Sequence, residues 1–286
     1  MRQSAQAFAP GNISGVFKII AHDDPSQMHS LGLGYTVREG VTATVTPREV
    51  QGVGVTFNGE VIDFPTVIGL AHRLAPDVGL AIELKTPLPL SSGFGLSGAS
   101  ALATGFAIDH LLELGKTRNE LAMLAHVLEV EQLTGLGDVC AQYHGGCLVK
   151  LQPGDPLAAQ RLPVEDGVAM HYRYFSPIRT RDILADPVRR QAINEAADAA
   201  LGRLGELADL PWVELATTIA ISRTFAEESG LLAHEGVRQS ITEVERKGGT
   251  ASMIMLGNAV YSTLPFTGSS ATSLSTRAVE GGEPDA

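Results

Sequence analysis

The sequence is poor in cysteine, with Cys140 and Cys147 as the only two among 286 residues. Two thiols without further cysteines or a histidine pair at zinc-finger spacing can build neither a disulfide scaffold nor a zinc knuckle. Apolar runs are short as well, and none approaches the ~20 residues that span a bilayer. The N-terminus lacks the basic start and long apolar stretch of a signal peptide. These absences predict a soluble, cytoplasmic protein with reduced thiols.

Basic residues are scarce relative to acidic ones: 21 Lys and Arg stand against 32 Asp and Glu, for a formal net charge of -11. Such a chain repels nucleic acid and acidic membrane surfaces, so we expect neither as a partner. A phosphate-bearing ligand then needs a local pocket of backbone amides, magnesium or a few cations. With 44% hydrophobic residues the chain can bury a full core, and its length suits two modest domains.

Turn signals and apolar periodicity predict a mixture of strands and helices. The expected strands lie within 7–61, with a hairpin turn at Asn58-Gly59, and at 78–84, 147–151 and 168–175. The expected helices are 67–74, 102–114, 119–133, 182–208 and 212–228. A last ordered segment is expected at 251–263. The Pro153–Pro156 turn marks a domain edge, so we expect domains over 1–156 and 157–266. Residues 267–286 have few large apolar side chains, and we expect a disordered tail.

A glycine-rich turn, Gly93–Ser100, leads into an apolar helix. Backbone amides at such a turn and at the helix N-terminus bind phosphate without a cationic side chain, although the glycines also suit a simple tight connection. A Walker A loop is excluded because no Gly-Lys-Ser/Thr ending follows. Gly93, Gly95 and Gly98 match the spacing of dinucleotide-binding folds, but Pro87 and Pro89 interrupt the strand that this motif requires.

Three motifs resemble, in the same order, those of the GHMP kinases, which include galactokinase and the homoserine, mevalonate and phosphomevalonate kinases. They are Ala9–Gly15, Pro89–Ala101 and Lys247–Ile254. Two further runs, Ser30–Gly34 and Thr134–Val139, are similar to the branch of this family that acts on pantoate. The resemblance implies the two-domain GHMP kinase fold, with an N-terminal α+β domain that carries the phosphate loop and a ferredoxin-like C-terminal domain.

The resemblance also implies which residues contact ATP and magnesium. The nucleotide contacts are expected at Pro89, Gly93, Gly95, Leu96, Ser97, Gly98, Ala99, Ser100 and Thr180. An ungapped match puts Ala99 where the family has a magnesium-binding serine, so Ser97 or Ser100 must supply the hydroxyl. We favour Ser100 because it opens the helix. Thr180 could equally cap a turn.

Glu129 and Glu131 both flank the apolar stripe of one predicted helix, so periodicity does not separate a functional carboxylate from a solvated one. The resemblance favours Glu129 as the magnesium ligand opposite Ser100. Asp138 could be no more than a helix N-cap. The resemblance implies that it orients or deprotonates the acceptor hydroxyl, which contributes roughly 10²–10⁴ in rate.

An acidic acceptor such as pantoate needs a cation and hydroxyl donors, and Ser30, His126 and Lys150 are the candidates. Each could instead be an ordinary surface or core side chain. The expected reaction transfers the γ-phosphoryl group of ATP to pantoate and gives 4-phosphopantoate for coenzyme A synthesis. A kinase of a mevalonate-like or sugar alcohol, a non-catalytic ligand-binding relative and an NAD-dependent oxidoreductase remain alternatives. The oligomeric state is open, with a homodimer among the possibilities.

Overall fold

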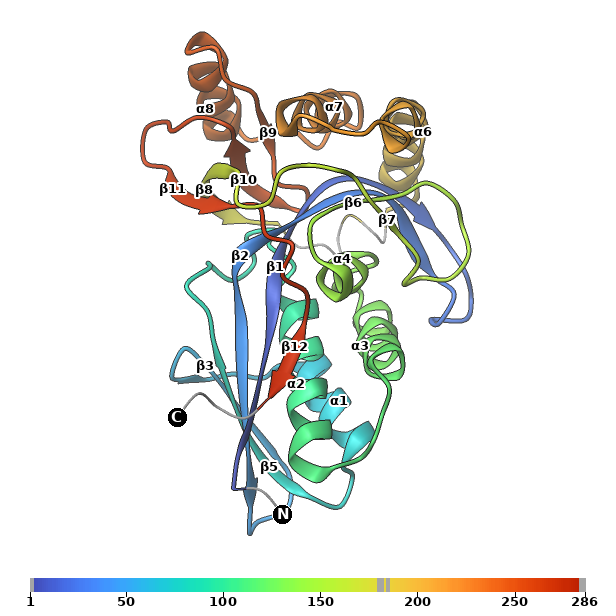
Figure 1. The fold of residues 1–286 in the computed structure, drawn as a ribbon, viewed down its shortest axis with the longest axis vertical. Coiled ribbons are helices and arrows are strands. Elements are labelled where there is room, and N and C mark those ends of the chain that lie inside the picture. Colours follow the sequence, from blue (N-terminus) through green and yellow to red (C-terminus); the bar gives the residue numbers. More distant parts are fainter. Residues whose placement is uncertain (1–2, 179–182, 184–185, 283–286) are drawn as a thin grey trace.

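The structure is a computed structural model that describes residues 3–178, 183 and 186–282, and it consists of two sheets with helices packed on them (Figure 1). The larger sheet has the strand order β12-β1-β2-β5-β3-β4, and β6 and β7 branch from β2. Its strands are β1 (Ala5–Ile20), β2 (His29–Arg48), β3 (Val53–Phe57), β4 (Glu60–Val61), β5 (Gly79–Lys85), β6 (Cys147–Lys150), β7 (Gln160–Arg161) and β12 (Glu280–Gly282). The Asn58-Gly59 turn joins β3 to β4 with both residues at positive φ, which confirms the expected hairpin.

Four helices follow in the N-terminal half: α1 (Pro65–Leu74), α2 (Leu96–Leu112), α3 (Arg118–Gln132) and α4 (Asp138–His144). The central one, α2, packs against β1 and β2, and α1 and α3 pack against α2. Every residue of α2 from Gly98 to Ile108 is buried, as expected for a helix that is apolar on all sides. The phosphate-loop candidate therefore opens into a helix that is buried on all sides over Gly98–Ile108.

The long β1–β2 ladder is interrupted twice, between Pro10 and Asn12 and between Ser14 and Val16. Such bulges turn side chains away from the regular alternation and often lie next to functional sites. Both interruptions fall within or directly after the first motif, Ala9–Gly15. They place Asn12 and Ser14 in the wall of the main cavity.

The second sheet is antiparallel, with the order β11-β8-β10-β9. Its strands are β8 (Ala169–Pro177), β9 (Ala251–Met253), β10 (Gly257–Ser262) and β11 (Ser270–Ser273). The helices of the C-terminal half are α6 (Pro187–Ala208), which packs against β1 and α7, and α7 (Leu215–Glu228) and α8 (Glu235–Arg246). These helices lie together at one end of the molecule (Figure 1). The two-sheet α+β architecture agrees with the expected fold. Helix α8 was not predicted, and the domain edge at Pro156 stays a prediction.

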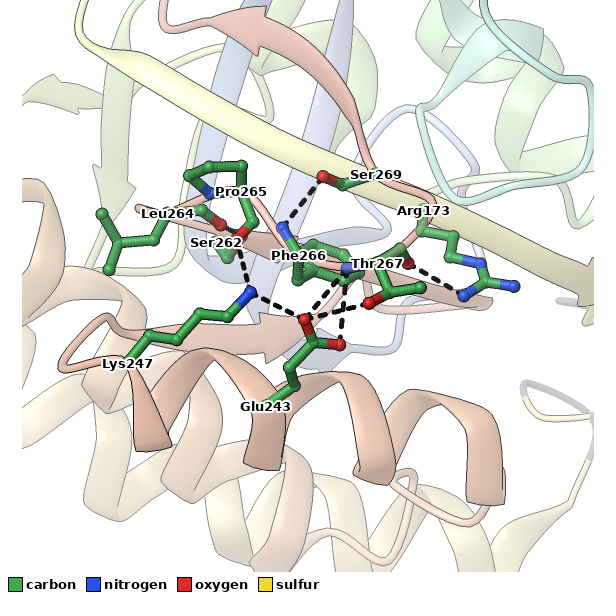
Figure 2. A network of polar contacts seen from close by, with 9 residues as sticks. All are labelled: Arg173, Glu243, Lys247, Ser262, Leu264, Pro265, Phe266, Thr267 and Ser269. Carbon is green, nitrogen blue, oxygen red and sulfur yellow. Dashed lines mark hydrogen bonds and ion pairs between the residues drawn. The ribbon is translucent and has the colours of Figure 1, made fainter.

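The expected disorder of the C-terminal segment is wrong for residues 267–282. Glu243 on α8 accepts hydrogen bonds from the backbone and the hydroxyl of Thr267, each at 3.1 Å, and Arg173 donates to the Thr267 carbonyl (Figure 2). Beyond this anchor the chain forms β11 and then β12, which pairs with the edge strand β1. Backbone pairing at a sheet edge does not need large apolar side chains, so composition alone does not reveal it.

No helix in the described part of the chain is long and apolar enough to cross a bilayer.

Candidate active site

A cavity of about 790 Å³ opens where the two sheets meet. Its lining includes Asn12 and Ser14 from β1, Ser30 from β2, Ser91–Ser97 of the glycine turn, Glu129, Thr134–Asp138, Lys150 from β6, and Met255 and Leu256. The three motifs and both additional runs that sequence analysis singled out thus contribute to, or directly border, one cavity. A cavity of this size holds a small-molecule ligand.

The glycine turn needs its glycines for two different reasons. Gly93 and Gly95 have φ of 88° and 59°, in the left-handed region that favours glycine. Space is also lacking: a Cβ atom on Gly93 would lie 2.7 Å from Ile254, and one on Gly95 would lie 2.8 Å from the carboxyl carbon of Asp138. Gly95 directly precedes α2, and Leu96 and Ser97 of the first turn line the cavity, so the N-terminus of the helix with its free amides lies at the cavity.

Gly95→Ala should therefore lower catalytic activity at least tenfold, because a Cβ atom at this position must displace the Asp138 carboxyl group. The matched control is Gly115→Ala. Gly115 has a similar φ of 69°, but nothing lies within 4 Å of its Cβ position. Both variants should lose the roughly 1–2 kcal/mol that a left-handed conformation costs, Gly95→Ala should lose more because of its close contact, and steady-state kinetics should show a large loss for Gly95→Ala alone. Equal activity of the two would remove the contact with Asp138 from the explanation.

Glu129 is 2% exposed on α3 and is held by two hydroxyl groups. Ser97 and Thr134 donate hydrogen bonds to its Oε1 at 2.5 and 2.7 Å. Its Oε2 is buried and has no partner in the described part of the protein. Burial raises the pKa of Glu129 to about 7, partly offset by the two hydroxyl donors. A buried carboxylate oxygen left without a donor fits a site for a cation.

Glu131, in contrast, is exposed and forms an ion pair with Arg73 at 2.6 Å. The structure thus separates the two acids that periodicity left equivalent. Glu129 faces the cavity, whereas Glu131 faces solvent.

Asp138 is the first residue of α4 and lines the same cavity. Its Oδ1 accepts a hydrogen bond of 2.7 Å from the Asn12 side chain. Burial raises the pKa of Asp138 to about 6, and the Asn12 donor lowers it. The N-cap residue of α4 is Gly137, and no side-chain cap is formed there, so the N-cap alternative does not account for Asp138. A carboxylate near its pKa at neutral pH suits proton transfer.

The predicted nucleotide contacts divide into two groups. Gly93, Gly95, Leu96 and Ser97 line the cavity, whereas Pro89, Gly98, Ala99 and Ser100 are not among its lining residues. Ser100 Oγ is buried without a partner in the described chain. Ser97 in the first turn of α2 takes the position against Glu129 that we expected for Ser100. Thr180 lies outside the described residues.

The acceptor candidates also divide. Ser30 and Lys150 line the cavity. Lys150 is 8% exposed, and its ammonium donates to the carbonyls of Asp155 and Ala158; burial lowers its pKa. His126 is not among the lining residues, and its Nε2 lies 3.0 Å from the Met28 carbonyl. Burial lowers the pKa of His126 to about 4, so it is neutral at pH 7 and its direct contact with an acidic acceptor stays a prediction.

Sequence analysis missed two polar residues of the site, Asn12 and Thr134. Asn12 lies in the first motif and Thr134 in the run that precedes Asp138, so both lay within segments already singled out. Their roles depend on contacts between segments: Asn12 reaches Asp138 across 126 positions of the chain. The bulge in β1 that turns Asn12 inward has no signal in residue periodicity.

Comparison with known proteins identifies the family of this chain. A family model described as the GHMP kinases N terminal domain matches residues 65–146. The pantoate kinase of Methanospirillum hungatei is 31% identical and covers 89% of this chain and 86% of that protein, and the pantoate kinase of Methanocaldococcus jannaschii is 30% identical and covers 89% and 90%. A solved structure described as a phosphotransferase related to the CoA biosynthesis pathway matches with a TM-score of 0.83 at 26% identity, over 98% of this chain and 99% of that one. The chain therefore belongs to the GHMP kinase family.

Proposed function

We propose that this enzyme transfers the γ-phosphoryl group of ATP to the primary hydroxyl group of pantoate, which yields 4-phosphopantoate for coenzyme A synthesis. The observation that carries the proposal is the meeting of the glycine turn, Glu129 and Asp138 in one cavity with Lys150. Phosphoryl transfer depends mainly on positioning and charge neutralisation. The near-full-length similarity to two pantoate kinases supports the choice of acceptor.

In this proposal, the amides of the glycine turn and the first turn of α2 bind the phosphates of ATP. Asp138, oriented by Asn12, accepts the proton of the acceptor hydroxyl group or holds that group in line for attack. The cavity wall formed by Leu256 and Leu136 excludes water from the transfer.

A magnesium ion would be held by Glu129 and Ser97 together with the phosphates of ATP. No group of three His, Cys, Asp or Glu side chains that could hold a metal occurs in the described residues. This donor set fits magnesium, which is usually bound by one or two carboxylates and substrate phosphates rather than by a complete protein cage. When bound, the ion neutralises the charge on the transferring phosphoryl group.

A panel of acceptor alcohols tests the proposal. ATP consumption should depend on pantoate and on magnesium, and it should be slower with mevalonate, homoserine, galactose and pantothenate. Faster phosphorylation of mevalonate or of a sugar would favour the alternative kinase. NAD reduction without ATP turnover would favour an oxidoreductase.

Lys150 is proposed to neutralise the pantoate carboxylate. An ammonium group has three donors, and two of them are used on the carbonyls of Asp155 and Ala158, which leaves one for the acceptor. Lys150→Met should raise the KM for pantoate by about 30-fold or more, because loss of one partner of a buried charged hydrogen bond costs roughly 2–5 kcal/mol. The KM for ATP should change little.

The control for this variant is Lys85→Met. Lys85 is exposed on β5, pairs with Glu83 and does not line the main cavity. Its loss should leave both KM values unchanged. If the pantoate KM of Lys150→Met equals that of wild type, a group other than Lys150 must recognise the carboxylate.

A further inference from the structure

Gln142 is a fully buried amide on α4 to which the reaction described above assigns no task. It lies four residues after Asp138, so the two side chains share one face of the short helix. Its Nε2 donates a hydrogen bond of 2.8 Å to the Gly95 carbonyl. The same helix face therefore carries the proposed catalytic carboxylate and a donor to the glycine turn.

The Gly95 carbonyl accepts two hydrogen bonds at the end of the phosphate-binding turn, one of them from Gln142. It also accepts the Ala99 amide at 3.0 Å and so closes the first turn of α2. A Cβ atom on Gly98 would lie 3.0 Å from Gln142 Oε1, and one on Gly95 would lie 2.8 Å from Asp138. Gly95 and Gly98, two of the three glycines that sequence analysis singled out, thus lack side chains where α4 approaches closely. Gln142 and Asp138 hold α4 against the start of α2.

Gln142 is itself fixed from behind by the C-terminal segment. The backbone carbonyl of Gln142 accepts a hydrogen bond of 2.9 Å from the Val279 amide. The backbone carbonyl of Val279 in turn accepts one of 3.0 Å from the Arg118 side chain on α3. Val279 is 1% exposed and directly precedes β12. Gln142 therefore joins the glycine turn, the α4 helix and the C-terminal segment.

We propose that Gln142 is a positioning residue that sets the distance between the phosphate-binding turn and the Asp138 carboxylate. Helix α4 has seven residues and no side-chain cap at its start, and so short a helix takes its orientation from tertiary contacts rather than from its own stability. The hydrogen bond to Gly95 is a direct polar link between this helix and the turn. The proposal rests on the proposed function, because it assigns Gln142 an effect on the same transfer step.

Two variants test the link. Gln142→Leu keeps the volume but removes the donor, and kcat should fall by about 100-fold, the loss expected from a displacement of about 1 Å, while the KM for pantoate stays near the wild-type value. Gln142→Glu places a carboxyl group that donates to the Gly95 carbonyl when protonated and repels it when ionised. The ratio of the kcat of this variant to that of wild type should therefore rise as the pH falls, a rescue that loss of packing would not produce.

The matched control is Ile108→Ala, which creates a cavity in the buried part of α2 away from the turn and the site. Activity of each variant is compared at equal folded fraction, measured by thermal unfolding. The proposal is overturned if Gln142→Leu retains the wild-type kcat, if its loss matches that of Ile108→Ala, or if the ratio for Gln142→Glu is independent of pH. Failure of the proposed function appears separately, as wild-type enzyme that phosphorylates another acceptor faster than pantoate; the same kcat comparison is then made with that acceptor. Wild-type enzyme inactive on every acceptor overturns both.

Discussion

Asp138→Asn should lower kcat by roughly 10²–10⁴-fold, the contribution of a well-placed acid or base, while the KM values for ATP and pantoate stay close to wild type. The expectation follows from the position of the carboxylate in the cavity and from its contact with Asn12. An asparagine keeps the size of the side chain and an oxygen for the Asn12 donor. Folding should therefore survive, and the loss should be confined to turnover.

The pH dependence gives this variant a second readout. Because burial raises the pKa of Asp138 to about 6, the wild-type kcat should fall as the pH drops through this value and the carboxylate takes up a proton. At saturating magnesium, which favours the ionised form of Glu129, the residual activity of Asp138→Asn should lack this limb. Asp63→Asn is the control, since Asp63 lines the same cavity but is exposed. An Asp138→Asn enzyme with wild-type turnover would leave the acceptor hydroxyl without its proposed partner.

The glycine turn illustrates what the sequence could establish. Its spacing, the apolar helix after it and the missing Gly-Lys-Ser/Thr ending are all local, and they excluded a Walker loop and spoke against a dinucleotide fold. The resemblance to the GHMP kinases was needed to favour a phosphate loop over a simple tight connection. The structure adds a second reason for Gly95 and Gly98, namely the close approach of α4. That approach joins segments some 45 residues apart, and no local pattern encodes it.

Ser97 and Ser100 show why the sequence did not reveal which hydroxyl group meets Glu129. An error of a residue or two in the start of a helix rotates the expected hydroxyl direction by about 100° per residue. Helix α2 is apolar on all sides, so its pattern does not fix its rotation. The hydroxyl that faces Glu129 therefore depended on the position of α3, which only the three-dimensional structure provides.

The prediction of a disordered C-terminal segment was wrong for a different reason. Its composition suggested too little apolar surface for order, yet Leu274 and Val279 are each 1% exposed. The rest of its order comes from backbone hydrogen bonds to β1, α4 and β8. Backbone groups are the same in every sequence, so an edge that accepts another strand is invisible until the sheet is built.

Glu129→Gln should abolish most kinase activity and at the same time stabilise the ligand-free protein. The loss of activity is expected because the amide removes the negative charge proposed to hold magnesium, and added magnesium should restore little of it. Stability should rise because the folded wild-type protein buries a partly ionised carboxylate whose Oε2 has no partner in the described chain, and the substitution removes that charge. Ser97 and Thr134 can still donate to the remaining carbonyl oxygen.

The pKa of Glu129 gives the sign and the pH window of this effect. Burial raises it from 4.5 to about 7, so the folded protein holds a proton more tightly than the unfolded chain, and the stability that this proton provides is lost as the pH rises from about 4.5 through 7. A shift of this size corresponds to up to about 3 kcal/mol. Urea unfolding without nucleotide or metal should show Glu129→Gln more stable than wild type at pH 8 by up to that amount, and equal to it near pH 4.

Glu131→Gln is the matched control, two residues away on the same helix. Glu131 is exposed and pairs with Arg73 at the surface, a contact of about 0–1 kcal/mol, so this variant should keep its activity and gain no stability at pH 8. A Glu129→Gln protein that is inactive but no more stable than wild type at pH 8 would mean that the ionised carboxylate is already compensated in the ligand-free fold. An active Glu129→Gln protein would require another group to hold the metal. If Glu129 is a buried carboxylate that serves to bind a cation, its substitution should raise stability and lower activity, and the substitution of Glu131 should do neither.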